Sequence, residues 1–147
     1  MILDERNEFA DATALGTSGT GRQLVGDVID LGATRAIGEG ETIEVVITVD
    51  TAVTSAGAAT VDFEVASDAQ AAVATDGTAT THGSTGAIGK ATLIAGYKTR
   101  IKINANSAER YIGLIANVGT AALTAGSVSA GIAATVSGWT AYADATN

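Results

Sequence analysis

The chain contains a single histidine, His82, which limits the acid–base chemistry that the sequence can support. A Ser–His–Asp triad needs an imidazole that is held in place by a third group on a rigid element. His82 lies instead in the polar run Thr80–Ser84, which we expect to be an exposed loop, and the chain has no G-x-S-x-G elbow. The sequence also has no cysteine, which excludes a thiol nucleophile and zinc–thiolate sites.

The segment Gly16–Arg22 is similar to a phosphate-binding loop only in its glycine content. The phosphate-binding pattern G-x-x-x-x-G-K-[ST] requires a lysine and lies between a strand and a helix. Here Arg22 replaces the lysine, Gln23 follows it, and no helical pattern begins. We therefore expect an ordinary flexible loop.

The chain has 16 carboxylates, so a cation site or an acid–base pair must be considered. Asp62 and Glu64 lie two residues apart, on what we expect to be the solvated face of a strand. Glu39, Glu41 and Glu44 flank a glycine turn. None of these groups matches the calcium-loop pattern, and nothing singles out two of them as a glycosidase pair. We predict no metal, no cofactor and no enzymatic activity.

Three cations, Lys98, Arg100 and Lys102, recur at every second position and so share one face of a strand. Two interpretations remain open. The row pairs with an acidic strand such as the one that carries Asp62 and Glu64, or it docks on an acidic partner surface.

Charge is unevenly distributed along the chain. Residues 1–76 hold 14 acidic and 3 basic side chains, whereas residues 77–147 hold 2 acidic and 5 basic ones. The formal net charge of −8 argues against nucleic acid and anionic membranes as partners.

The elements that must position these residues are short strands. Apolar and polar residues alternate with the period of two that indicates a strand. The clearest segments are Ile43–Val49, Thr60–Val65, Tyr97–Ile103 and Ser127–Val136, and weaker ones are Val25–Leu31, Ile88–Ile94 and Tyr111–Asn117. Glycine turns separate them, which favours an antiparallel sandwich or barrel. Residues 66–74 could form a helical turn or a ragged strand, and Thr75–Gly86 a long loop.

Two regions divide the chain. We expect residues 1–24 to be an N-terminal arm and flexible loop, and residues 25–147 to be one β-domain. No apolar signal segment follows Met1, so we expect a protein that is not secreted. Residues 111–143 carry no charge, but their frequent glycines favour buried strands over a membrane span.

Small side chains dominate the composition. Ala, Gly and Thr together make up 69 of the 147 residues, and Leu, Ile, Val and Phe only 33. A monomer would therefore have a thin core, and assembly with other chains would add buried area.

Landmarks along nearly the whole chain resemble capsid cement (decoration) proteins of short-tailed phages, of the Bordetella-phage type. They are Met1–Asp4, Asn7–Phe9, Asp11–Ala12, Val28–Gly32, Val49–Ala52, Gly57–Thr60, Leu93–Tyr97, Glu109–Tyr111 and Trp139–Tyr142, whereas Ala71–Thr85 carries no landmark.

The resemblance implies an all-β jelly-roll sandwich of about eight strands that binds the outer surface of an HK97-like phage head and bridges its capsomers. The implied partners are the major capsid protein and further copies of the chain, as a dimer or trimer. We expect contacts with neighbouring subunits at Ile2, Leu3, Phe9, Lys98, Arg100 and Lys102. Within the subunit we expect an ion pair of Glu109 and Arg110, and packing roles for Tyr111 and Trp139.

Two alternatives stay open. One is another virion β-domain, from a tail or a fibre, that binds a receptor. The other is a small β-sandwich module that binds calcium or carbohydrate.

Overall fold

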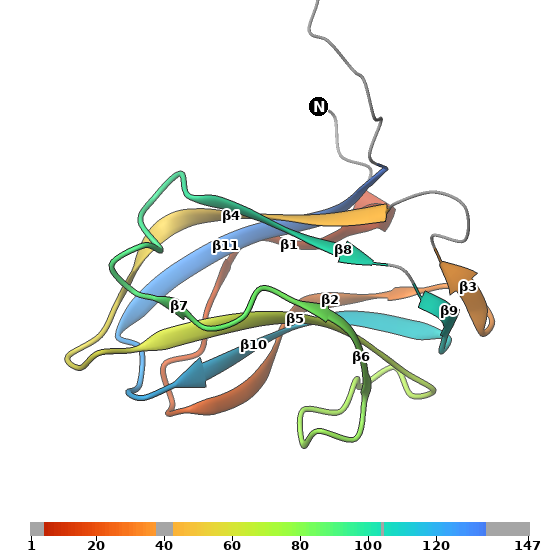
Figure 1. Ribbon diagram of the computed structural model, residues 1–147, viewed down its shortest axis with the longest axis horizontal. Coiled ribbons are helices and arrows are strands. Elements are labelled where there is room, and N and C mark those ends of the chain that lie inside the picture. The colour runs from red at the N-terminus through yellow and green to blue at the C-terminus, as the bar shows by residue number, and fades with distance from the viewer. Residues whose placement is uncertain (1–4, 38–42, 104, 135–147) are drawn as a thin grey trace, which may run out of the picture.

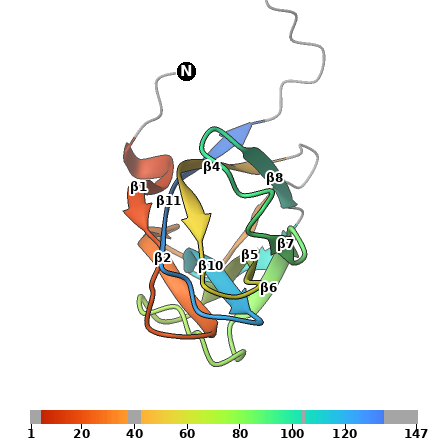
Figure 2. The same ribbon diagram turned by 90° about the vertical axis from the view of Figure 1, so that its left-hand side faces the viewer.

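In the computed structural model, residues 5–37, 43–103 and 105–134 are described, and they form two β-sheets packed face to face (Figures 1 and 2). The four-stranded sheet has the order β1 (Glu8–Ala14), β11 (Ala125–Ala134), β4 (Ile43–Thr54) and β8 (Lys98–Ile103). The five-stranded sheet has the order β2 (Gly21–Asp30), β10 (Tyr111–Gly119), β5 (Thr60–Asp68) and β6 (Thr80–Ser84), and β7 (Ile88–Gly89) also pairs with β5. The 3₁₀-helix η1 (Glu5–Asn7) precedes β1, and β3 (Arg35–Ile37) pairs with β9 (Ala105–Ala108).

The topology is that of a jelly roll. The strand order β1-β11-β4-β8 faces the order β2-β10-β5-β6, so the chain passes repeatedly from one sheet to the other. Every strand pair among the described residues is antiparallel. Eight strands in two such sheets make a double-sheet jelly roll. The structure therefore confirms the all-β sandwich that the sequence predicts.

The core lies between the sheets and follows the alternation seen in the sequence. Val61, Phe63 and Val65 of β5 are fully buried, and so are Val45 and Ile47 of β4. Most other core residues are Val, Ile, Leu and Ala, so packing rests on close contact of small and β-branched side chains.

The first correction concerns the expected arm at residues 1–24. From Glu8 onward this segment belongs to the sandwich, because β1 pairs with β11 and β2 pairs with β10. Phe9 is only 1% exposed and lies in the core, so it is not available for contact with a neighbouring subunit. The polar composition around it marks a strand at the sheet edge, where one face is buried and the other is solvated.

The second difference lies between β5 and β6. Thr80–Ser84, expected within a loop, forms edge strand β6, and β5 extends to Asp68 instead of ending at Val65. The β7 region is shorter than expected, since only Ile88 and Gly89 of the segment up to Ile94 are in a strand.

The uncharged stretch forms strands as far as it is described. Residues 111–134 contain β10 and β11, and no described helix is long and apolar enough to cross a membrane.

Candidate functional site

The cationic row of Lys98, Arg100 and Lys102 lies on the outer face of the four-stranded sheet, along its edge strand β8. Register places Arg100 opposite Val46 and Lys102 opposite Glu44 of β4. All three cationic side chains are exposed, because their neighbours Thr99, Ile101 and Ile103 take the inward positions.

The acidic neighbour of this row is Glu44 rather than Asp62 or Glu64. Nη1 of Arg100 lies 3.5 Å from Oε2 of Glu44, whose side chain is 8% exposed, whereas that of Arg100 is 67% exposed. Because this contact is long and Arg100 is largely solvated, the pair contributes little to stability and leaves most of the guanidinium surface free. Asp62 and Glu64 belong to the other sheet, so the pairing that the sequence suggested does not form.

Small polar residues form the opposite half of the same outer face. The Ser129 hydroxyl donates to Oδ2 of Asp50 at 2.7 Å and accepts the backbone N–H of Ala12 at 2.9 Å. Ala12 has a φ of 45°, so β1 is bulged here and a hydroxyl replaces a backbone partner.

The outer face of the five-stranded sheet is covered by the chain itself. Residues 69–79, between β5 and β6, fold back so that Val73 and Ala79 pack on Ala66 and Ile115 in a second apolar cluster (Figure 1). The carboxylate of Asp68 accepts the backbone N–H groups of Gln70 and Ala74, which anchors the segment and lowers the pKa of Asp68. The two sheets therefore differ, because part of one outer face is shielded by this segment.

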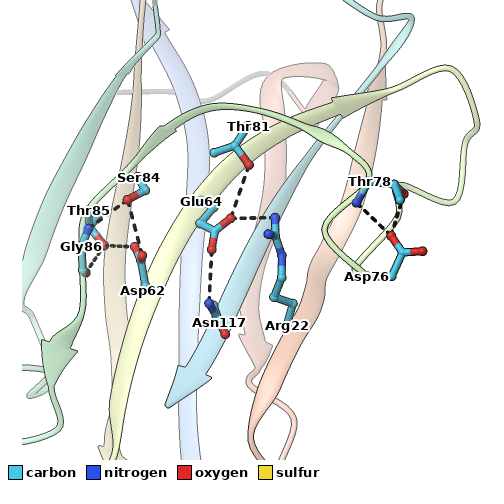
Figure 3. Close-up of polar contacts among 10 residues, drawn as sticks. All are labelled: Arg22, Asp62, Glu64, Asp76, Thr78, Thr81, Ser84, Thr85, Gly86 and Asn117. Atoms are coloured by element: carbon cyan, nitrogen blue, oxygen red, sulfur yellow. Dashed lines mark hydrogen bonds and ion pairs between the residues drawn. The ribbon is translucent and has the colours of Figure 1, made fainter.

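A polar cluster surrounds Glu64 on the rest of that face (Figure 3). Nη2 of Arg22 lies 2.7 Å from Oε2 of Glu64, and the Asn117 amide and the Thr81 hydroxyl donate to the same carboxylate at 3.4 and 3.5 Å. These partners neutralise a carboxylate that is nearly buried, so the cluster holds β2, β10, β5 and β6 together.

The other carboxylates that the sequence analysis named either accept hydrogen bonds or lie outside the described residues. Asp62 accepts hydrogen bonds from the hydroxyls of Ser84 and Thr85. Glu39 and Glu41 lie outside the described residues. Across the described part of the chain, no three potential ligands gather in a way that would hold a metal ion.

The glycine-rich loop before β2 ends in a strand and not in a helix. Arg22, which stands at the lysine position of a phosphate loop, lies in β2 and is paired with Glu64. The loop therefore lacks the helix N-terminus that such a site requires.

Arg110 forms its ion pair with Asp30 and not with Glu109. Nε and Nη2 of Arg110 donate to the two carboxylate oxygens of Asp30, both at 2.8 Å. These bonds, with the N–H of Gly32, lower the pKa of Asp30 to about 2. Glu109 and Arg110 lie in the connection between β9 and β10, and the register of β10 with β2 brings Arg110 beside Asp30.

Tyr111 is partly buried against the second apolar cluster, and the Arg110 guanidinium lies 5.0 Å from the centre of its ring. These contacts agree with the packing role expected for Tyr111. Ile2, Leu3 and Trp139 lie outside the described residues.

His82 is fixed in β6 rather than free in a loop. Its Nε2 atom lies 2.7 Å from the hydroxyl oxygen of Ser67, which also accepts the backbone N–H of Glu109 at 3.0 Å. Ser67 is 0% exposed, so a substrate cannot reach its hydroxyl in this structure, and the contact with His82 is an internal hydrogen bond. Burial lowers the pKa of His82, and the Glu109 carboxylate opposes this effect.

Sequence reasoning missed two features of this arrangement. One is Glu44, which the β4 alternation places on the face that carries the cationic row but whose pairing depends on register. The other is the covering segment 69–79, whose Thr, Ala and Gly content resembles that of a loop.

A comparison with protein families identifies the family to which this chain belongs. A family model described as Bbp16 matches residues 9–132. The chain belongs to the Bbp16 family. The name of this family suggests a Bordetella phage protein, which agrees with the coarser part of the resemblance drawn from the sequence. The Bbp16 match begins at Phe9, inside β1, and ends at Ile132, inside β11, so it covers the whole sandwich. No curated protein matches the chain.

Proposed function

We propose that this Bbp16-family chain is a capsid decoration protein, which binds the outer surface of a phage head and stabilises it by bridging capsomers without covalent bonds. The role is structural, with no enzymatic step. Its partners are the major capsid protein and further copies of the chain.

The observation that carries the proposal is the difference between the two outer faces. Residues 69–79 and the Glu64 cluster occupy the five-stranded sheet, whereas the four-stranded sheet ends in three exposed cations on one regular edge strand. Such a row fits a negatively charged surface and fixes the orientation of docking more than it adds affinity. Affinity then arises from many weak contacts repeated over a closed shell.

The direct test is co-sedimentation of the purified protein with expanded, decoration-free heads of its source phage. We expect binding to saturate at a fixed number of copies per head and the heads to resist heating. If a folded protein does not bind, the proposal is wrong. Affinity for a receptor on the host surface would then favour a tail or fibre role, and stabilisation by calcium a cation-binding module.

The cationic row provides a sharper prediction. In the variant Lys98→Gln, Arg100→Gln, Lys102→Gln we expect roughly tenfold weaker head binding at low salt and a smaller difference at high salt, because salt screens exposed charges. Binding isotherms at two salt concentrations measure this effect.

A matched control has the same net charge. Gln70→Glu, Ala71→Glu, Ala72→Glu also lowers the net charge by three, by adding three carboxylates at exposed positions of the segment that covers the other sheet. We expect this control to bind heads like the wild type. Equal losses in both variants would mean that overall charge, not the row, governs docking.

A further inference from the structure

Five of the described strands are edges of the two sheets, and one of them, β7, is only two residues long; among the other four, β8 alone has no register shift. β1 has two register shifts against β11, β2 has one against β10, and β6 has one against β5. β8 pairs with β4 over six consecutive residues without a shift. Bulges are a common means of preventing an edge from pairing with another strand, so β8 is the edge that lacks this protection.

The main-chain groups of the three cationic residues point away from β4. The N–H of Val49 donates to the carbonyl of Tyr97 at 2.9 Å, which fixes the phase of the antiparallel ladder. Because hydrogen-bonded positions alternate, Thr99, Ile101 and Ile103 bond to β4, whereas Lys98, Arg100 and Lys102 direct their N–H and C=O groups to the free edge.

No described strand other than β4 pairs with β8. The carbonyl of Lys102 lies near the other sheet, since a Cβ atom at Gly83 of β6 would be 3.0 Å from it. The free edge therefore presents a row of main-chain donors and acceptors, which are the N–H and C=O groups of Lys98 and Arg100 and the N–H of Lys102. Positive side chains flank this row.

We propose that β8 is a docking edge for an extended acidic segment of the partner, which adds a fifth strand to the four-stranded sheet. This inference rests on the proposed docking function and names the chemistry of the partner. Main-chain bonds would supply affinity, and carboxylates at every second position would lie beside the cationic row. The same charges disfavour pairing of β8 with β8 of a second copy, because like charges would lie across from one another.

The probe is the acidic peptide Thr-Glu-Val-Glu-Val-Glu-Thr, whose sequence reads the same in both directions and so serves parallel and antiparallel docking. Amide hydrogen exchange of the full chain is followed by NMR with and without this peptide. We expect exchange at Lys98, Arg100 and Lys102 to slow at least roughly tenfold, with little change at Thr99 and Ile101, whose N–H groups already bond to β4. Attraction of charges alone would not produce this alternation.

A peptide with the same sequence and N-methylated glutamates and valines keeps its charge but loses the main-chain donors that would face β8, which are those of the glutamates in antiparallel docking and those of the valines in parallel docking. We expect it to bind at least roughly tenfold more weakly than the unmodified peptide. Equal binding of both peptides, or protection at β1 instead of β8, would overturn the proposal.

Two variants link the edge to the phage head. Arg100→Pro removes the charge and the outward N–H, whereas Arg100→Gln removes the charge alone, and proline is tolerated on an edge strand where its N–H would face solvent. We expect Arg100→Pro to bind heads more weakly than Arg100→Gln. If both bind equally while the wild type binds well, the strand-addition proposal fails and the decoration function stands. If the wild type does not bind heads, the function fails, and the peptide experiment still decides the chemistry of the edge.

Discussion

The hydrogen bond between Ser67 and His82 makes the free energy of unfolding depend on the protonation of His82. The Ser67 oxygen already accepts the N–H of Glu109, so its own proton is free to donate to Nε2 of a neutral imidazole. A protonated His82 would place a second donor on this oxygen and leave the serine proton without a partner in a buried position. Geometry and burial therefore favour the neutral form.

We predict that the free energy of unfolding decreases as the pH falls below 6.5, the ordinary pKa of histidine. The folded pKa of His82 is lowered, so the unfolded chain binds the proton more readily and acid favours unfolding. Urea unfolding between pH 7.5 and 5 measures this slope. The NMR titration of His82, which is unambiguous because the chain has one histidine, gives its folded pKa.

His82→Gln is the control, since it does not titrate in this range and its slope should be nearly flat. Ser67→Ala should cost about 1–3 kcal/mol, because it leaves the partly buried N–H of Glu109 without its acceptor. An unchanged pH slope in His82→Gln would assign the effect to other groups.

At the scale of elements, the close approach of β1 and β2 depends on one glycine. Gly26 has a φ of +66°, and a Cβ atom there would collide with the backbone carbonyl oxygen of Phe9. The close approach of Gly26 and Phe9 brings edge strand β1 of one sheet next to edge strand β2 of the other and closes this side of the sandwich (Figure 2).

Gly26→Ala is predicted to destabilise the protein by about 2–4 kcal/mol, from the left-handed backbone and the collision together. Gly32→Ala is the matched control, because Gly32 has a φ of +76° but open space around the position of a Cβ atom. It should cost only about 1–2 kcal/mol. Chemical denaturation of both variants gives the difference, and equal losses would mean that β1 moves away without cost.

The strands that sequence patterns predict are those in which apolar and polar residues alternate. Val61, Phe63 and Val65 alternate with Asp62 and Glu64, so β5 is evident from the sequence. β1 and β6 are not, because an edge strand of small and polar residues has the composition of a loop. Sequence patterns also do not predict the partner of Arg110, since Asp30 is 80 residues away and only strand register brings it near.

The whole molecule has one large core and one small one, and their stabilities should differ. The main cluster joins both sheets, whereas the outer cluster consists of four buried residues, Ala66, Val73, Ala79 and Ile115, beneath segment 69–79. A segment with so little buried apolar surface opens without unfolding the rest.

Native-state hydrogen exchange should therefore show two levels of protection. We expect Ala74, whose N–H bonds to Asp68, to exchange through an opening that low denaturant concentrations barely affect, whereas amides of β5 exchange only with global unfolding. If the amides of Ala74 and of β5 exchange with the same free energy of opening and the same denaturant dependence, the covering segment unfolds together with the rest of the protein.

The strand order also bears on how the cell makes this protein. β10 and β11 are the last described strands to be synthesised, yet each occupies an interior place in its sheet. Among the described strands, β1 pairs only with β11 and β2 only with β10, so the strands made first have no sheet partner until the last ones emerge from the ribosome. While it grows, the chain can pair β4 with β8 and β5 with β6 and β7, and nothing more of either sheet. The jelly roll is completed only once β10 and β11 have emerged, and a ribosome that stops before β10 releases a product with unpaired edges, a substrate for chaperones and proteases.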